Sequence, residues 1–466
     1  MSQNAVTDDL ISKSATDLCR LLAAGAVSSA EIVAACLRRI DEMNPSLNAV
    51  VTVAPEVMDR ARQLDSDRAQ GKIAGPLHGL PITIKDTIDT ANIRTTRGSR
   101  LFADHVPASD AVVVAKLKAA GAIVLGKTNV PEMAVPYETN NLVFGRTNNP
   151  RDLSRTPGGS SGGEAAAIAA GLSPAGIGSD LSGSIRIPAH FCGIAGLKPT
   201  TGAVSMAGHL PQATGTLSLG AAIGPMATRV ADLALLFNVI SDQSTAELRY
   251  QDQELSGVGV ACCFDQEASP VQDEIAGAVR QAASILSEAG LTVVEECPSA
   301  MSHAARLWIE LFSRPANQQI RDLYRGREDQ SGLAVSRLLP TDHGTTFEER
   351  IEIAEALAAA VVERERRREQ LLRWMRHTPL ILAPVSATPA FEHGATRVTV
   401  HGRSISVFRS CSYAHMANAF GLPAVVVPVA RTAAGLPIGV QLIGRPWAEA
   451  QVLAVAAIIE RETGCK

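Results

Sequence analysis

The chain has 466 residues, of which 46% are hydrophobic and 19% are charged, and its formal net charge at pH 7 is −4. This balance is typical of a globular protein that buries a large core, and it argues against a chain that binds nucleic acid through an overall basic field. Aromatic residues make up only 4%, so alanine, valine, isoleucine and leucine must build the interior, which suits buried strands flanked by helices.

The N-terminal residues and the cysteines indicate a cytoplasmic protein. The opening MSQNAVTDDL has no basic start followed by an apolar run, so we expect no signal peptide. No uninterrupted apolar stretch reaches the roughly 18 residues of a membrane span. The eight cysteines form no CxxC pair, which predicts neither a zinc site nor a redox motif and favours reduced thiols.

Helical signals dominate residues 1–75. A capping pattern opens a helix at Ser14, and Gly25 is its expected stop. A second helix is expected to start at Ser28 or Ser29 and to stop before Pro45, and a third to span about 55–70. These segments predict a helical layer that wraps a core.

The core begins in the stretch 80–86, where a short strand carrying Ile82 and Ile84 is expected to end on Lys85. A helix from about 109 and a strand at 122–126 follow, and this alternation predicts a sheet with helices packed on it. Residues 121–128 match the phosphate-loop pattern GxxxxGK[ST]. We reject nucleotide binding there, because the centre of the match is apolar and strand-forming, whereas a phosphate loop needs a flexible turn.

Two serine sites, Ser160/Ser161 and Ser182/Ser184, lie in the glycine-rich stretch 157–200. Between them we expect a helix over 162–170 and a strand over 175–178, and a tight loop at 180–184 follows. A helix that begins inside a glycine loop presents free backbone N–H groups at that loop. The stretch therefore provides hydroxyl groups next to hydrogen-bond donors.

The second half of the chain repeats the α/β signals. We expect a helix capped by Thr228, strands at 258–264 and 291–295 with a helix over 271–288 between them, and further strands at 380–383, 424–429 and 438–443. A long helix is expected over 347–376, where the charged run 363–369 is interpreted as a solvated face, and a last helix over 446–462. The first and last strands resemble one sheet, so one large domain fits better than two.

The serine chemistry allows two interpretations. Residues 158–162 match GxSxG, the nucleophile elbow of α/β-hydrolases, but that elbow follows a strand, and 148–156 is polar and contains proline. The better interpretation uses a lysine as the base, since a serine hydroxyl needs a proton acceptor and burial makes a lysine amine neutral. Lys85, Ser160 and Ser184 would then form a proton-transfer chain. The N–H groups of the loop formed by Leu181, Ser182, Gly183 and Ser184 would stabilise a developing oxyanion.

At this point the chain resembles the amidase signature family of serine amidohydrolases. The matching motifs cover most of the chain and are densest between about 78 and 240: GLPITIKD around Lys85, GKTN at 126–129, PGGSSGGEAAA at 157–167, SDLSGSIRIPAHFCGIAGLKPT at 179–200, GPM at 224–226 and GLPIGVQLIG at 435–444. One position departs from the family pattern, because Ser182 stands where glycine is common. A serine there would be strained only if its φ were positive.

The resemblance implies a fold and a set of roles. The expected fold is α/β, a single large domain with a mixed central sheet covered by helices on both faces, in which 1–75 is the helical layer, 78–240 the signature core, 241–345 a variable region and 346–466 the rest of the sheet. Ser184 would be the nucleophile, Lys85 the base and Ser160 the bridging serine, held by a cis peptide bond. No metal or organic cofactor is implied. Substrate-pocket candidates are Met133, Tyr137 and Phe144.

The implied function is hydrolysis of a carboxylic amide to an acid and ammonia or an amine, with aryl or medium-chain acyl amides as the expected substrates. The alternative is an amidotransferase A-like chain that serves as the glutaminase of a tRNA-dependent complex, and a third possibility is a binding protein without activity. As partners we expect a small-molecule amide, no nucleic acid and no membrane, and we leave a homodimer open.

Overall fold

A mixed 11-stranded sheet runs through the molecule in the order β1-β3-β2-β6-β8-β7-β14-β15-β11-β9-β10. The computed structural model describes residues 9–242, 248–264, 270–339 and 347–464, with the backbone alone for 347–350. The sheet strands are β1 (Val50–Val53), β2 (Pro81–Lys85), β3 (Ile123–Thr128), β6 (Ala175–Asp180), β7 (Ala195–Lys198), β8 (Ala222–Ala227), β9 (Gly259–Cys262), β10 (Thr292–Glu295), β11 (Leu380–Pro384), β14 (Ala424–Arg431) and β15 (Pro437–Ile443).

The sheet combines two parallel groups through an antiparallel centre. β3, β2 and β6 are parallel neighbours, as are β11, β9 and β10. Between these groups β6, β8, β7, β14, β15 and β11 pair antiparallel in turn. Strands β14, β15 and β11 from the end of the chain therefore lie between β7 and β9 from earlier in the chain, which confirms the single α/β domain. The short pairs β4 (Asn140–Asn141) with β5 (Gly145–Arg146) and β12 (Arg397–Val400) with β13 (Arg403–Ser406) stand apart from this sheet.

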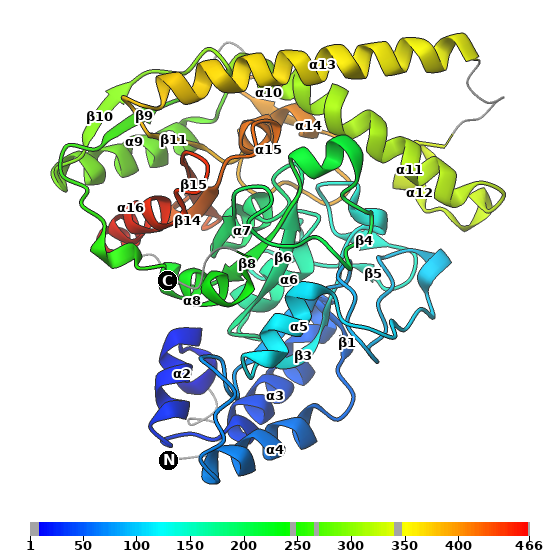
Figure 1. Cartoon of the computed structure of the whole chain (residues 1–466), viewed down its shortest axis with the longest axis vertical. Helices are drawn as coiled ribbons and strands as arrows, with labels where there is room; N and C mark the ends of the chain where they lie inside the picture. Colours follow the sequence, from blue (N-terminus) through cyan, green and yellow to red (C-terminus); the bar gives the residue numbers. More distant parts are fainter. Residues whose placement is uncertain (1–8, 243–247, 265–269, 340–346, 465–466) are drawn as a thin grey trace.

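Helices flank the sheet in two groups. α8, α9 and α16 contact one another or the strands β7, β8, β11, β14 and β15, while α6 and α7 contact each other and the strands around the serine sites. Figure 1 shows α2, α3 and α4 gathered at one end of the molecule and α13 along the opposite end. The helix bounds are α2 (Ala15–Ala23), α3 (Ser29–Leu47), α4 (Val57–Ala69), α5 (Val112–Ala119), α6 (Gly162–Ala169), α7 (Arg186–Cys192), α8 (Val230–Ile240), α9 (Asp273–Glu288), α10 (Met301–Trp308), α11 (Arg314–Tyr324), α12 (Leu333–Ser336), α13 (Phe347–Trp374), α14 (Val407–Ser410), α15 (His415–Ala419) and α16 (Glu449–Thr463).

The N-terminal helices begin where the capping residues predict. Ser14 caps α2, and Ser28 forms a full capping box with Glu31 at the start of α3. The predicted stop before Pro45 is wrong, since α3 continues to Leu47 and ends on Asn48 at φ 53°. A proline in the last turn removes one hydrogen bond near the frayed end, and Asn tolerates the left-handed conformation that ends the helix.

Residues 121–128 contain strand β3, which confirms that they do not form a phosphate loop. Other elements differ from the sequence expectation. β1, β7, β8 and the short helix α7 carry no clear signal of their own, and Arg229 rather than Thr228 caps α8. The charged run on α13 is only partly solvated, because Arg364 is buried and donates to the carbonyl of Ala419.

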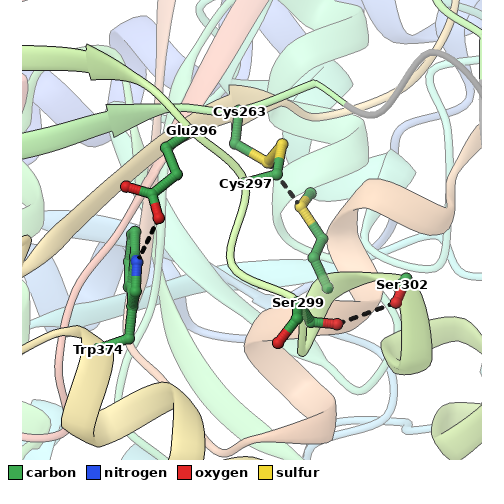
Figure 2. Close-up of a disulfide and its surroundings, with 7 residues drawn as sticks. Cys263, Glu296, Cys297, Ser299, Ser302 and Trp374 are labelled. Carbon is green, nitrogen blue, oxygen red and sulfur yellow. Dashed lines mark hydrogen bonds between the residues drawn. A yellow bond between two sulfur atoms is a disulfide. The ribbon is translucent and has the colours of Figure 1, made fainter.

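The expectation that all cysteines are reduced is wrong for Cys263 and Cys297, which form a disulfide. β10 pairs parallel with β9 so that Glu295 lies opposite Cys262, and the residues that follow both strands meet. Figure 2 shows the bond just beyond the strand ends, close to the Glu296 carboxylate that accepts from Trp374. A separation of 34 residues forms no recognisable cysteine motif, so sequence spacing could not reveal the pair.

In the described part of the chain, no helix combines the length and apolar character needed to cross a bilayer.

Candidate active site

Lys85, the last residue of β2, is fully buried beneath the serine loops. Its Nζ lies 2.7 Å from Ser160 Oγ, 3.0 Å from Ser179 Oγ and 3.3 Å from the carbonyl oxygen of Ser179. The parallel pairing of β2 with β6 places the end of β2 beside the end of β6, where Ser179 lies. The predicted lysine at a strand end is thus held by the segment that leads into the second serine site.

Burial lowers the pKa of Lys85 to about 7, although the carboxylates of Asp180 and Glu164 act in the opposite direction. An amine that leaves water loses solvation of its charged form, so the neutral form becomes accessible near neutral pH. Lys85 can therefore accept a proton, which an ordinary surface lysine at neutral pH cannot.

The two serine loops lie side by side. The Gly159–Ser160 peptide is cis, as the family resemblance implies. The N–H of Ser161 donates to the carbonyl of Ser184 at 3.1 Å, and Ser160 and Ser184 both line a cavity of about 270 Å³. The structure thus places Ser160 and Ser184 on one cavity wall, with Lys85 buried behind Ser160.

A buried ion pair anchors the loop that carries Ser184. The Arg186 guanidinium donates to both carboxylate oxygens of Asp180, each at 3.0 Å. Asn418 and Gln441 accept from the same guanidinium. Burial alone would raise the pKa of Asp180, but Arg186 holds it well below its ordinary value. The fixed Asp180 carboxylate also accepts from the N–H groups of Gly183 and Ile185, at 2.8 and 3.1 Å.

The hydrogen bond from Gly183 to Asp180 reduces the predicted set of oxyanion donors. The Gly183 N–H is already paired with the Asp180 carboxylate, whereas the N–H groups of Leu181, Ser182 and Ser184 do not donate to that carboxylate. Ser182 is not among the residues with positive φ, so the serine at this position is unstrained. Gly183 has φ 101°, and a Cβ there would lie 2.6 Å from that of Ala414. Glycine is therefore required at 183 and dispensable at 182.

His209, a residue without any signal in the sequence, completes the surroundings of Lys85. Its Nδ1 lies 2.9 Å from the carbonyl of Pro211, which only accepts, so Nδ1 carries the proton. Nε2 then accepts from the Ser179 hydroxyl at 2.9 Å. Burial lowers the pKa of His209 to about 3, so the ring stays neutral. Because its proton is committed to His209, the Ser179 hydroxyl can only accept from Lys85.

The cavity is lined mostly by apolar side chains. Of the three residues expected to bind the substrate, Met133 and Tyr137 line this cavity and Phe144 does not. Phe144 lies in the turn between β4 and β5, where its ring packs under the Arg94 guanidinium. Much of the wall comes from the middle of the chain, for which the sequence predicts no role: Leu217, Trp308, Phe312, Ala316, Ile320 and Leu338.

Two aromatic side chains of the cavity wall, Trp308 and Tyr137, also donate hydrogen bonds to the nucleophile loop. The Trp308 indole donates to the carbonyl of Leu181 at 2.6 Å, and the Tyr137 hydroxyl donates to the carbonyl of Ser182 at 3.2 Å. His415 stacks on Trp308 and contacts the Tyr137 hydroxyl. Isolated aromatic residues carry no sequence signal for such a role. Among the described residues, no group of three His, Cys, Asp or Glu side chains is placed to hold a metal ion.

Comparison with known proteins agrees with this geometry. The Amidase family model matches residues 31–453. The A subunit of glutamyl-tRNA(Gln) amidotransferase from Carboxydothermus hydrogenoformans is 35% identical over 97% of both chains. A crystal structure described as an amidase superposes with a TM-score of 0.87 at 26% identity, covering 97% of this chain and 100% of that one.

A bacterial aryl acylamidase of the amidase signature family has a TM-score of 0.84 at 26% identity, covering 96% of each chain. The family match spans nearly the whole chain, and the solved neighbours share its fold from end to end. The chain therefore belongs to the amidase signature family and is an amide-hydrolysing enzyme.

Proposed function

We propose that the enzyme cleaves a carboxylic amide through an acyl-enzyme on Ser184, with Lys85 as the base and Ser160 as the relay. The observation that carries this proposal is the buried, low-pKa Lys85 amine at 2.7 Å from Ser160 Oγ, in the cavity that Ser184 also lines. Neither serine needs a histidine in this scheme, and His209 and His415 are each committed to other partners.

In the acylation step, Ser184 Oγ attacks the amide carbon while its proton passes to Ser160, whose own proton passes to Lys85. The N–H groups of Leu181, Ser182 and Ser184 are the proposed donors to the oxyanion. The lysine then returns its proton through Ser160 to the departing nitrogen, and the C–N bond breaks. In deacylation water attacks the ester carbon and its proton passes through Ser160 to Lys85. The ester C–O bond then breaks, the proton returns through Ser160 to Ser184 Oγ, and the acid is released.

Two substrate classes are candidates, and a different observation favours each. The sequence comparison favours glutamine: the curated relative is the A subunit of a glutamyl-tRNA(Gln) amidotransferase along its whole length. If glutamine is the substrate, the chain releases ammonia from it as one subunit of a tRNA-dependent complex. It would then bind partner proteins and act together with a nucleic acid, whereas the sequence analysis expects a small-molecule partner alone.

The cavity favours a neutral amide with an apolar acyl or amine group. Glutamine carries an ammonium and a carboxylate, which need charged partners once they leave water. Among the described residues that line the cavity, none is Lys, Arg or Glu, and Asp180 is already paired with Arg186. The remaining wall is largely aromatic and aliphatic, which suits aryl or medium-chain acyl amides.

The test is a substrate panel with the purified chain: hexanamide, an acyl anilide and glutamine, each followed by release of ammonia or amine. Ser184→Ala is the control for contaminating activity. Turnover of the apolar amides by the chain alone supports the second candidate. Glutaminase activity that appears only when partner subunits co-purify supports the first. A panel in which Ser184→Ala matches the unmodified chain overturns the mechanism itself.

Cellular location and self-association stay predictions. The Cys263–Cys297 disulfide removes the reduced-thiol argument for the cytoplasm. Light scattering during size-exclusion chromatography measures whether the chain is a homodimer.

A further inference from the structure

We infer that Trp308 and Tyr137 position the oxyanion loop, residues 181–184, so that its N–H groups face the substrate carbonyl. The inference rests on the proposed role of Ser184, and it adds residues that neither contribute a proton nor attack. They act by holding the carbonyl groups of Leu181 and Ser182.

Peptide geometry couples each carbonyl of the loop to the N–H that follows it. In a trans peptide the C=O and the following N–H point in opposite directions. The peptides joining 180 to 184 are trans, because the cis bonds in the described chain are Gly159–Ser160 and Leu210–Pro211. Holding the Leu181 carbonyl therefore fixes the direction of the Ser182 N–H. The Trp308 indole holds that carbonyl at 2.6 Å.

All four peptide planes of the loop are held by their carbonyl groups. The carbonyl of Asp180 accepts from Asn418 at 3.3 Å, that of Ser182 from Tyr137 at 3.2 Å, and that of Gly183 from the Ile187 N–H at 2.7 Å. A loop of consecutive peptides is otherwise free to flip, and a flipped peptide would present a carbonyl to the oxyanion. The carbonyl contacts oppose that flip at every position.

Each aromatic donor is itself fixed. The Trp308 ring stacks on His415 with centroids 4.8 Å apart and an interplanar angle of 14°. Tyr137 gives its single proton to Ser182, so its oxygen accepts from His415 Nε2 at 2.9 Å. His415 Nδ1 is then the unprotonated nitrogen, which agrees with its having no hydrogen-bond partner among the described residues. Burial lowers the pKa of His415 to about 3, so its ring is neutral near pH 7 and keeps these hydrogen bonds.

The three rings come from distant parts of the chain. Tyr137 lies in the loop after β3, Trp308 ends α10 and His415 begins α15. The middle region of the chain thus reaches the catalytic centre through one indole N–H. Trp308 is a positioning residue, since its polar atom contacts the loop and not the reacting atoms.

The test compares Trp308→Phe with Trp374→Phe. Phenylalanine keeps a stacking ring and removes only the indole donor. Trp374 is a matched control because its indole also donates one hydrogen bond, to Glu296 at 2.8 Å, in the disulfide region (Figure 2) and away from the cavity. With the fastest amide of the panel, we expect Trp308→Phe to lower kcat about 10- to 100-fold and to change KM less than about twofold, because one oxyanion donor is worth up to ~10³.

A second readout separates positioning from general damage. A trifluoromethyl ketone carrying the acyl group of that amide forms a tetrahedral oxyanion on the nucleophile, so its affinity should fall by the same factor as kcat. Tyr137→Phe keeps the ring and frees the Ser182 carbonyl, whose following N–H belongs to Gly183 and donates to Asp180. It should therefore lower kcat and inhibitor affinity less than Trp308→Phe does. The inference is overturned if kcat and inhibitor affinity of both variants match the Trp374→Phe control, or if KM rises while kcat holds. Should Ser184→Ala remain active, the proposed function fails separately.

Discussion

At the scale of single residues, the chemistry depends on the charge of Lys85. Burial is the dominant influence and lowers its pKa to about 7, while Asp180 and Glu164 oppose it. His209 stays neutral because burial lowers its pKa to about 3. The balance between burial and two carboxylates therefore sets the pH at which the base becomes available.

The pH profile follows from this balance. A base must be unprotonated, so kcat/KM should rise as the pH increases through about 7 and level off above it. Burial raises the pKa of Glu164 itself to about 7, so its charge favours the ammonium form of Lys85 only as the pH rises into this range. Glu164→Gln removes that charge, so the rise should move to lower pH. Initial rates from pH 5.5 to 9.5 with a neutral amide measure both profiles. Activity that is greatest on the acid side and declines through pH 7 would contradict the assignment.

His209 directs the lone pair of the neutral lysine. Without its acceptor nitrogen, the Ser179 hydroxyl is free to donate to Lys85 and to compete with Ser160. We expect His209→Phe to lower kcat by about tenfold with little change in KM, a fraction of the ~10²–10⁴-fold that a positioned base contributes. Ser179→Ala removes the competing donor, so the double variant should lose less than the sum of the two single losses. Additive losses would show that the two residues act independently.

The sequence identified some of these residues and not others, for a physical reason. Lys85, Ser160 and Ser184 stand in dense motifs in which glycine, serine and strand ends occur at fixed spacing. Ser179, His209 and Trp308 act through contacts made only in three dimensions, and a lone histidine or tryptophan forms no pattern along the chain. Phe144 does not line the cavity, because nearness in sequence to Tyr137 does not place it on the same wall.

At the scale of elements, the turn between β6 and α7 sets the active-site geometry. Gly183 has φ 101° and no room for a Cβ, whereas Ser182 has an ordinary φ. Gly183→Ala should lower the free energy of unfolding by about 1–3 kcal/mol and abolish most activity, because the strained backbone would shift the loop. Ser182→Gly should cost less than about 1 kcal/mol. Thermal melts and kcat of both variants check this, and an active, fully stable Gly183→Ala would refute it.

The disulfide fastens the segment that leads from β10 into α10, the helix that carries Trp308. Closing a loop over a separation of 34 residues contributes about 3–4 kcal/mol in the chain-entropy view. A reductant should therefore lower the melting temperature of the unmodified chain and leave Cys263→Ala/Cys297→Ala unaffected. Thiol titration after denaturation without reductant should find two fewer than the eight cysteines. Equal melts with and without reductant, or eight free thiols, would count against the bond.

Element type was more predictable than element boundaries and pairings. The strands ending at Lys85 and preceding the nucleophile loop begin with apolar residues, and both are buried along their whole length, polar ends included. α7 escapes prediction because its sequence, RIPAHFC, is short and contains proline in its first turn. The end of α3 was predicted too early, because Pro45 lies in the last turn, where the loss of one backbone N–H donor does not stop the helix.

At the scale of the whole molecule, the sheet order makes the two halves of the chain interdependent. β14 pairs with β7, and β11 is the strand that links β15 to β9. A chain ending at residue 345 would expose the edge of β7 and detach β9 and β10 from the rest. We expect it to lack a cooperative thermal transition and near-ultraviolet circular dichroism. A cooperative melt of this fragment would show that the halves fold separately.

The single α/β domain was predictable because apolar runs recur from residue 80 to residue 443 with no linker composition between them. The strand order was not, since β9 and β10 join the far edge through β11, and residue patterns along one strand do not name its neighbours. The position of α10 and α11 over the cavity follows from that order, which is why the middle region showed no function in sequence.

The identity of the nucleophile is the assignment on which the others depend. Incubation with a fluorophosphonate, followed by peptide mass spectrometry, locates the serine that forms the covalent adduct. We expect modification of Ser184, slower modification of the same residue in Ser160→Ala and Lys85→Ala, and none in Ser184→Ala. An adduct on Ser160 with Ser184 unmodified would contradict the assignment.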